Sequence, residues 1–214
     1  MRYNFLMYKL FIKRILDVIL SLSALLVLAV PMLIFMLIIK REDRGSAFFT
    51  QRRIGKHKKI FLMYKFRSMK TNTPHDTPTH LLKKPEQYIT GVGRFLRKSS
   101  LDELPQIWDI FVGNMSIVGP RPALWNQDDL IAERDKYGAN DVRPGLTGWA
   151  QINGRDELEI EKKAKLDGEY VAILKQGGLD AFLMDAKCFF RTFVSVAKHE
   201  GIVEGGTGAL GSGK

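Results

Sequence analysis

The sequence contains one cysteine, Cys188, so no disulfide can form within the chain, which fits a reducing compartment. Internal repeats and zinc-type Cys/His clusters are also missing from the sequence, and its four histidines are scattered. Acidic residues are outnumbered, with 23 Asp and Glu against 33 Lys and Arg and a formal net charge of +10. So basic a chain favours polyanions, namely nucleic acid, anionic lipid or phosphorylated substrates, and charge alone does not choose among them.

Charged residues are absent from residues 18–39. This stretch is longer than the apolar region of a typical secretory signal, and Lys40, Arg41 and Arg44 follow it directly. We interpret it as a retained membrane segment rather than a cleaved signal. The preceding residues 1–14 mix aromatic and basic side chains, which suit a membrane interface. We therefore expect residues 1–40 to associate with the membrane.

The apolar segment contains Pro31, and two topologies compete. As one helix, residues 18–39 would reach about 33 Å, enough to cross a hydrocarbon core of about 30 Å. Against a single crossing, Pro31 leaves the Val27 carbonyl without its helical partner, and both flanks are basic. We expect a re-entrant helix that breaks at Pro31 and returns to the same side. Ser21 and Ser23 would bond backbone carbonyls and help to bend the first arm.

The rest of the chain mixes strands with helices, which predicts an α+β fold with a mostly helical domain over residues 41–204. Residues 48–54 and 59–66 are expected to form a small β-hairpin around Gly55. Helices are expected at 91–98, 104–112, 126–137, 157–174 and from 179 onward, with loops at 71–85, 113–122 and 143–155. The Gly-rich tail, residues 205–214, is interpreted as disordered or as a cloning remnant.

The last expected helix is amphipathic and basic, and it has two interpretations. Its apolar residues recur at helical spacing, with basic residues between them: Phe182, Leu183, Ala186, Phe190, Phe193 and Ala197, separated by Lys187, Arg191 and Lys198. Such a helix can lie on a membrane surface as an interfacial helix, or it can cover the protein core. The sequence leaves both interpretations open.

Two adjacent carboxylates, Asp102 and Glu103, stand out in the middle of the chain. Ser100 and Glu103 have capping-box spacing, so Glu103 could simply close the start of a helix. Pro105 disfavours a smooth first turn, because its ring would meet the Leu101 carbonyl. In a functional interpretation, an Asp carboxylate attacks a phosphorus centre and a neighbouring carboxylate holds a hard cation such as Mg²⁺.

Cations occur with this pair along the chain. Lys65 and Arg67 alternate with Phe66 on an expected strand, so they should share one face. Arg121 lies between two prolines in a stiff loop, and a guanidinium can grip phosphate oxygens bidentately. Each cation alone is typical of a solvated surface, and their occurrence with a carboxylate pair is what indicates a phosphate site.

Four blocks resemble the motifs of the bacterial sugar transferase family, the monotopic phosphoglycosyl transferases. They are residues 65–69 (KFRSM), 96–106 (LRKSSLDELPQ), 116–122 (SIVGPRP) and 143–155 (RPGLTGWAQINGR), in the family's order. The chain lacks the large multi-span extension that precedes this domain in some members, so it resembles the minimal catalytic unit. The resemblance also implies a re-entrant membrane helix.

The resemblance implies a role for each matching position. Asp102 matches the nucleophile, and Glu103 matches a second catalytic carboxylate that binds Mg²⁺ or Mn²⁺. Substrate-binding residues in the matching motifs are Lys65, Arg67, Arg97, Arg121, Gln151, Asn153 and Arg155. The implied reaction moves a sugar phosphate from a UDP-sugar to a polyprenyl phosphate through an aspartyl phospho-sugar, releasing UMP at the cytoplasmic face of the bacterial inner membrane. Membrane lipids and downstream glycosyltransferases are the implied partners.

Two alternatives come from other classes of protein. A basic membrane-tethered nucleic-acid-binding protein would explain the charge but not the Asp102–Glu103 pair, so we expect no nucleic-acid partner. A non-enzymatic membrane scaffold would tolerate conservative changes at Asp102, and it has no need for the Arg- and Pro-containing loop around Arg121.

Overall fold

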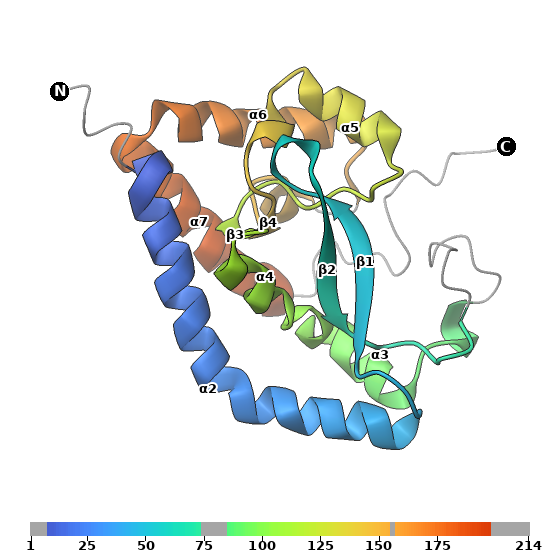
Figure 1. Cartoon of the computed structure of the whole chain (residues 1–214). Helices are drawn as coiled ribbons and strands as arrows, with labels where there is room; N and C mark the ends of the chain where they lie inside the picture. The colour runs from blue at the N-terminus through green and yellow to red at the C-terminus, as the bar shows by residue number, and fades with distance from the viewer. Residues whose placement is uncertain (1–7, 74–84, 155–156, 198–214) are drawn as a thin grey trace, which may run out of the picture.

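The computed structural model describes residues 8–73, 85–154 and 157–197, and over these residues the fold is α+β, as expected. Six α-helices lie in this part of the chain: α2 (Lys13–Glu42), α3 (Gly91–Lys98), α4 (Gln106–Val112), α5 (Asp128–Asp135), α6 (Ile160–Gln176) and α7 (Gly178–Ala197) (Figure 1). The strands are β1 (Phe48–Ile54), β2 (Ile60–Phe66), β3 (Ser116–Val118) and β4 (Gly145–Thr147). Short helical turns include η1 (Tyr8–Ile12), η5 (Leu101–Glu103), η6 (Ala139–Asp141) and η7 (Gln151–Asn153).

The strands form two separate pairs. β1 and β2 make the expected antiparallel hairpin, with Phe48 opposite Phe66 and Ile54 opposite Ile60. β3 and β4 pair in parallel, although both regions were expected to be loops. Three-residue strands among glycines and prolines give no alternation to detect. Their backbones approach so closely that a Cβ built on Gly145 would lie 2.1 Å from the Gly119 nitrogen, which is why glycine is needed there.

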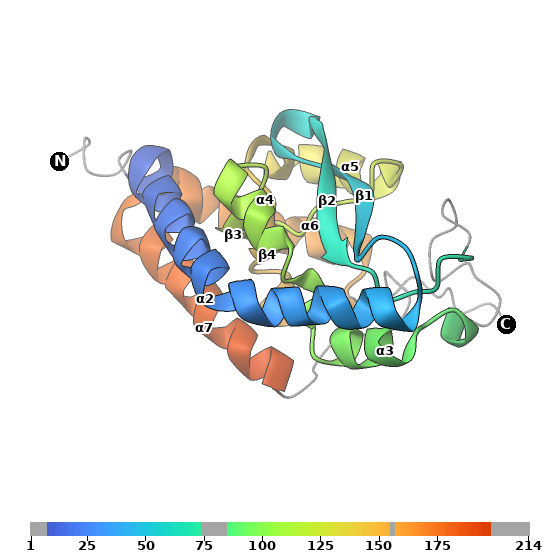
Figure 2. The same cartoon turned by 60° about the horizontal axis from the view of Figure 1, so that its bottom comes forward.

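The long N-terminal helix α2 stays helical through Pro31 and bends near its middle, where an interruption was expected (Figures 1 and 2). A proline inside a helix removes one backbone hydrogen bond and displaces the preceding turn, which accounts for a bend of this kind. The Ser21 hydroxyl donates to the Asp17 carbonyl (2.5 Å) and to the Val18 carbonyl (3.2 Å). The expected bonding of Ser21 to the backbone is therefore confirmed. The helix ends at Glu42, two residues beyond the expected boundary of the membrane segment.

α2 is long and apolar enough to cross a membrane, and only 6% of its most apolar 18-residue stretch is buried in the protein. Leu26, Val27 and Val30, for example, are each more than 60% exposed. A core helix of a soluble protein would bury such side chains. The composition and exposure of α2 are therefore consistent with membrane association.

Polar contacts tie α2 to the rest of the protein at both ends. Arg14 donates to the carbonyls of Ile110 and Phe111 at the end of α4, at 2.7 and 2.8 Å. The buried Asp17 carboxylate accepts hydrogen bonds from the Ser116 hydroxyl and the Ile117 nitrogen at the start of β3, at 2.8 and 3.0 Å. At the other end, the Glu42 carboxylate accepts from the nitrogens of Gly91 and Val92 and so caps α3.

Apolar clusters hold the segments around η5 in place. Phe66, Leu96 and Ile39 form one cluster, which joins the hairpin, α3 and the second arm of α2. Met63, Ile110 and Met115 form another between β2 and α4. The turn η5 lies in sequence between α3 and α4, so both clusters fix its flanks.

The C-terminal helix α7 turns small or polar side chains inward, among them Ala181, Asp185 and Cys188. Its large apolar residues are exposed instead: Phe182 43%, Leu183 52%, Phe190 67% and Phe193 61%. The residues whose spacing predicted the helix are therefore not those that cover the core. α7 therefore covers the core with one face, and its opposite, exposed apolar face has the character of an interfacial helix.

Candidate functional site

The Asp102–Glu103 pair lies on the tight turn η5, not on a regular helix. Ser100 adopts a left-handed conformation (φ 56°), and its side chain makes no capping hydrogen bond. α4 begins only at Gln106, with Pro105 at its N-cap. The capping-box alternative is therefore wrong, and the distorted turn expected from Pro105 is confirmed. A non-glycine residue with positive φ is strained, and such strain is common at functional sites.

Glu103 is held between two cations from distant parts of the chain. The Lys65 ammonium on β2 lies 2.8 Å from Glu103 Oε1. The Arg121 guanidinium lies 2.7 Å from the same oxygen through Nη2, and 3.5 Å from Oε2 through Nη1. Although burial raises the pKa of Glu103, Arg121 and Lys65 outweigh it and hold that pKa well below its ordinary value. Glu103 is therefore an anion at every physiological pH.

Asp102 is buried beside this cluster, with 9% of its surface exposed. Burial raises the pKa of Asp102, and the negative charge of Glu103 raises it further, while the charges of Lys65, Arg97 and Arg121 oppose the rise. A carboxylate that is partly desolvated is less stabilised by water and more reactive toward an electrophile. The two carboxylates thus differ: cations neutralise the charge of Glu103, whereas burial destabilises the anionic form of Asp102.

Arg97, in the last turn of α3, adds a third positive charge close to Asp102. Its Nη1 is buried and has no hydrogen-bond partner among the described residues. A buried guanidinium nitrogen is costly to leave unpaired, so this donor is suited to an anion that binds at the site. Lys65, Arg97 and Arg121 are thus three of the expected substrate-binding residues that the fold gathers around Asp102.

Arg67 has different partners from Lys65. Its guanidinium donates to the Asp43 and Arg44 carbonyls just after α2, and it lies 3.8 Å from the Asp43 carboxylate. β2 ends at Phe66, so strand alternation does not extend to Arg67. In this structure Arg67 stabilises the end of α2 rather than contacting the Asp102–Glu103 pair.

The loop after β4 carries two more of the expected residues. Asn153 donates to the Trp149 carbonyl at 2.7 Å, a local bond within the loop. Both polar atoms of the Gln151 amide are buried without a partner in the described part of the chain. A Cβ built on Gly148 would lie 2.9 Å from Gln151 Oε1 and 2.1 Å from the Gly119 carbonyl, so Gln151 lies close to the loop that carries Arg121. Arg155 lies outside the described residues.

The donor set at η5 is compatible with a hard divalent cation. No group of three or more His, Cys, Asp or Glu side chains suited to a metal occurs among residues 8–73, 85–154 and 157–197. Mg²⁺ commonly binds through one or two carboxylates and takes its other ligands from substrate phosphates and water. Glu103 fits that pattern as the protein carboxylate, and a bound metal would take over part of the neutralisation that Lys65 and Arg121 supply.

Comparison with known proteins gives this site a context. The family model described as "Bacterial sugar transferase" matches residues 8–199. The chain belongs to the bacterial sugar transferase family. The match covers α2, the hairpin, η5 and the loops around Arg121 and Gln151, so every described element of the candidate site lies within the family domain.

Relatives within the family include both short and long chains. The uncharacterized sugar transferase EpsL of Bacillus subtilis is 37% identical over 191 residues, which cover 89% of this chain and 90% of EpsL. The undecaprenyl-phosphate galactose phosphotransferase of Salmonella typhimurium is 34% identical over 75% of this chain. The UDP-glucose:undecaprenyl-phosphate glucose-1-phosphate transferase of Xanthomonas campestris is 40% identical over 74% of it. These matches cover 36% and 34% of the last two relatives, so this chain corresponds to about a third of their length.

Proposed function

We propose that this protein is a phosphoglycosyl transferase that moves a sugar 1-phosphate from a UDP-sugar to a polyprenyl phosphate. The observation that carries the proposal is the buried Asp102 beside Glu103, with Lys65, Arg97 and Arg121 around them. Three cations against two carboxylates leave a net positive site that suits a diphosphate. The names of the Salmonella and Xanthomonas relatives both give an undecaprenyl-phosphate acceptor, and the Xanthomonas name also gives a UDP-sugar donor, which supports the proposed classes.

The proposed reaction has two displacements at phosphorus. An Asp102 carboxylate oxygen attacks the β-phosphorus of the UDP-sugar, and the bond to the bridging oxygen breaks, so UMP leaves. The sugar phosphate is then held on Asp102 as an acyl phosphate. A phosphate oxygen of the polyprenyl phosphate attacks the same phosphorus, and the Asp102 carboxylate leaves. The product is a diphosphate-linked lipid sugar, the substrate class that downstream glycosyltransferases would extend.

In this scheme the surrounding residues bind the substrate and neutralise the charge of its phosphates. Lys65, Arg97 and Arg121 stabilise the negative charge of the phosphate oxygens. Glu103 would hold Mg²⁺ or Mn²⁺, and the metal when bound neutralises the diphosphate. Gln151 is the loop residue that we propose contacts the donor, because its buried amide has no partner. We assign Arg67 and Asn153 a supporting role, through their bonds to the backbone.

The exposed apolar surfaces support the membrane arrangement that we propose. α2 would enter the cytoplasmic leaflet and return at its bend, and the exposed face of α7 would lie at the interface. UDP-sugars are cytosolic, so the catalytic domain belongs on the cytoplasmic side of the bacterial inner membrane. The arrangement would bring the soluble donor and the lipid acceptor to one site.

The proposed function is tested by measuring UMP release from a panel of UDP-sugars, with and without polyprenyl phosphate. We expect one or a few UDP-sugars to give UMP, and the acceptor to make the release catalytic. Failure of every UDP-sugar, together with salt-sensitive binding to random DNA, would favour the nucleic-acid-binding alternative.

A further inference from the structure

The loop that carries Arg121 is fixed along its backbone. Each carbonyl oxygen from Pro120 to Ala123 accepts a hydrogen bond of 2.9 Å, and the donors are, in order, Gly145 N, Arg134 Nη1, Arg53 Nη1 and Ile54 N. Two of these donors are backbone nitrogens on strands, and the other two are arginine side chains. A loop held at every carbonyl presents its side chains in one arrangement.

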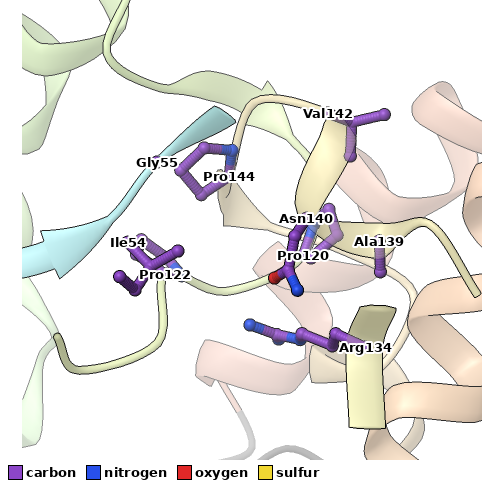
Figure 3. A pocket seen from close by; sticks show the side chains of 9 residues that line it. All are labelled: Ile54, Gly55, Pro120, Pro122, Arg134, Ala139, Asn140, Val142 and Pro144. Atoms are coloured by element: carbon purple, nitrogen blue, oxygen red, sulfur yellow. The ribbon is translucent and has the colours of Figure 1, made fainter. Parts of the chain in front are cut away.

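Arg134 on α5 is the donor that reaches Arg121 itself. Its side chain is 4% exposed, and Figure 3 shows it pointing toward the chain between Pro120 and Pro122, the neighbours of Arg121. The cavity that these residues line is about 10 Å³, roughly the space of one water molecule, so it has no room for a substrate. Arg134 therefore contacts the backbone of the loop, at the Arg121 carbonyl, and does not line a substrate cavity.

Asp167 on α6 sets the direction of Arg134. Its Oδ2 lies 2.8 Å from Arg134 Nε and 2.6 Å from Nη2, which leaves Nη1 to donate to the Arg121 carbonyl. Both side chains are nearly inaccessible to water, with 4% and 1% exposed. A buried ion pair often adds little net stability, because desolvation offsets the attraction. The main effect of this ion pair is therefore to fix the orientation of the Arg134 guanidinium.

We propose that Asp167 and Arg134 are positioning residues for Arg121. They form a continuous chain of contacts: Asp167 orients Arg134, Arg134 holds the Arg121 carbonyl, and the Arg121 guanidinium grips Glu103. The inference rests on the proposed function, in which Arg121 binds donor phosphate. It brings α5 and α6, which carry none of the expected site residues, into the catalytic machinery.

The test is a double-mutant cycle between Arg134→Lys and Arg121→Ala, measured as UMP release. A lysine keeps a cation for Asp167, but its single ammonium cannot also serve the Arg121 carbonyl. We expect Arg134→Lys alone to lower kcat/KM about 10- to 100-fold, as small displacements of binding groups do. In the Arg121→Ala background the same change should alter the residual rate less than about twofold.

Lys58→Ala is the matched control, because it removes an exposed ion pair to Asp135 on the same helix without touching the loop. It should leave kcat/KM unchanged. Equal losses from Arg134→Lys in both backgrounds, or no loss in either, would overturn the proposal. If Arg134→Lys does not fold, Asp167→Asn takes its place in the cycle.

Hydrogen exchange separates this inference from the proposed function. Amide protection of Gly119, Gly145 and Ile54, whose backbone N–H groups bond within or to this loop, should fall in Arg134→Lys and remain at the wild-type level in Lys58→Ala, whatever substrate the protein uses. Unchanged protection in both variants would contradict the positioning role even if UMP release is observed. Absence of UMP release with lost protection would instead contradict the proposed function alone.

Discussion

Arg121→Lys should impair the enzyme although it preserves the charge. The guanidinium of Arg121 faces both oxygens of Glu103, at 2.7 and 3.5 Å, with two separate nitrogens. Lysine offers one ammonium on a different stem, and the loop carbonyls on both sides are fixed, so the backbone cannot move to compensate. A hydrogen bond to a charged group contributes about 1.5–3 kcal/mol, which corresponds to about a 10- to 150-fold loss in kcat/KM.

Initial rates of UMP release, at varied UDP-sugar and saturating polyprenyl phosphate, measure this loss. Arg52→Lys is the control, because Arg52 is an exposed arginine on β1 that stacks on Trp125 and lies outside the candidate site. Its kinetics should match the wild type. If Arg121→Lys also matches the wild type, Arg121 does not act through its two-nitrogen fork and its assigned role is wrong.

Excess chelator should stop UMP release, added Mg²⁺ or Mn²⁺ should restore it, and Glu103→Gln should raise the metal concentration required; full activity in chelator would exclude the metal role. Because the pKa of Asp102 is raised, adduct formation with the donor should decline on acidification at a pH above the ordinary aspartate value of 3.8. A decline that begins only at or below 3.8 would contradict the effect of burial on Asp102. Because the pKa of Glu103 is lowered, its contribution to stability is present above its unfolded value of 4.5 and is lost as pH falls toward the lower folded value, which thermal melting against pH measures. For topology, a single cysteine at Tyr3→Cys in a Cys188→Ser background should resist an impermeant thiol reagent in intact cells and react after lysis; labelling from outside would mean that α2 spans the membrane.

Much of the candidate site could be anticipated because it lies in contiguous motifs. Asp102 and Glu103 are adjacent in sequence, and Pro105 indicated a distorted turn, which the structure has. The hairpin followed from alternation, and its second strand begins within one residue of the expected position. The motifs could not predict which cation contacts which carboxylate. The contact of Lys65 with Glu103 joins residues 38 apart, and only the packing of β2 beside η5 creates it.

The features that the sequence hid are of three kinds. Ser100 takes a left-handed conformation that glycine, asparagine or aspartate would signal but serine does not. β3 and β4 are too short for a periodic pattern, so their regions were expected to be loops. Arg134 and Asp167 lie on two separate helices, 33 residues apart, and nothing in either helix distinguishes them from the neighbouring charged residues that face solvent.

The central claim is that Asp102 carries the sugar phosphate during the reaction. Intact-protein mass, measured after incubation with the UDP-sugar in the absence of acceptor, tests it most directly. The wild type and the exposed control Asp128→Asn should gain the mass of one sugar phosphate, and adding polyprenyl phosphate should remove it. Asp102→Asn should show no gain, because an amide has no anionic oxygen to attack phosphorus. An adduct on Asp102→Asn, or turnover without any adduct on the wild type, would contradict the account.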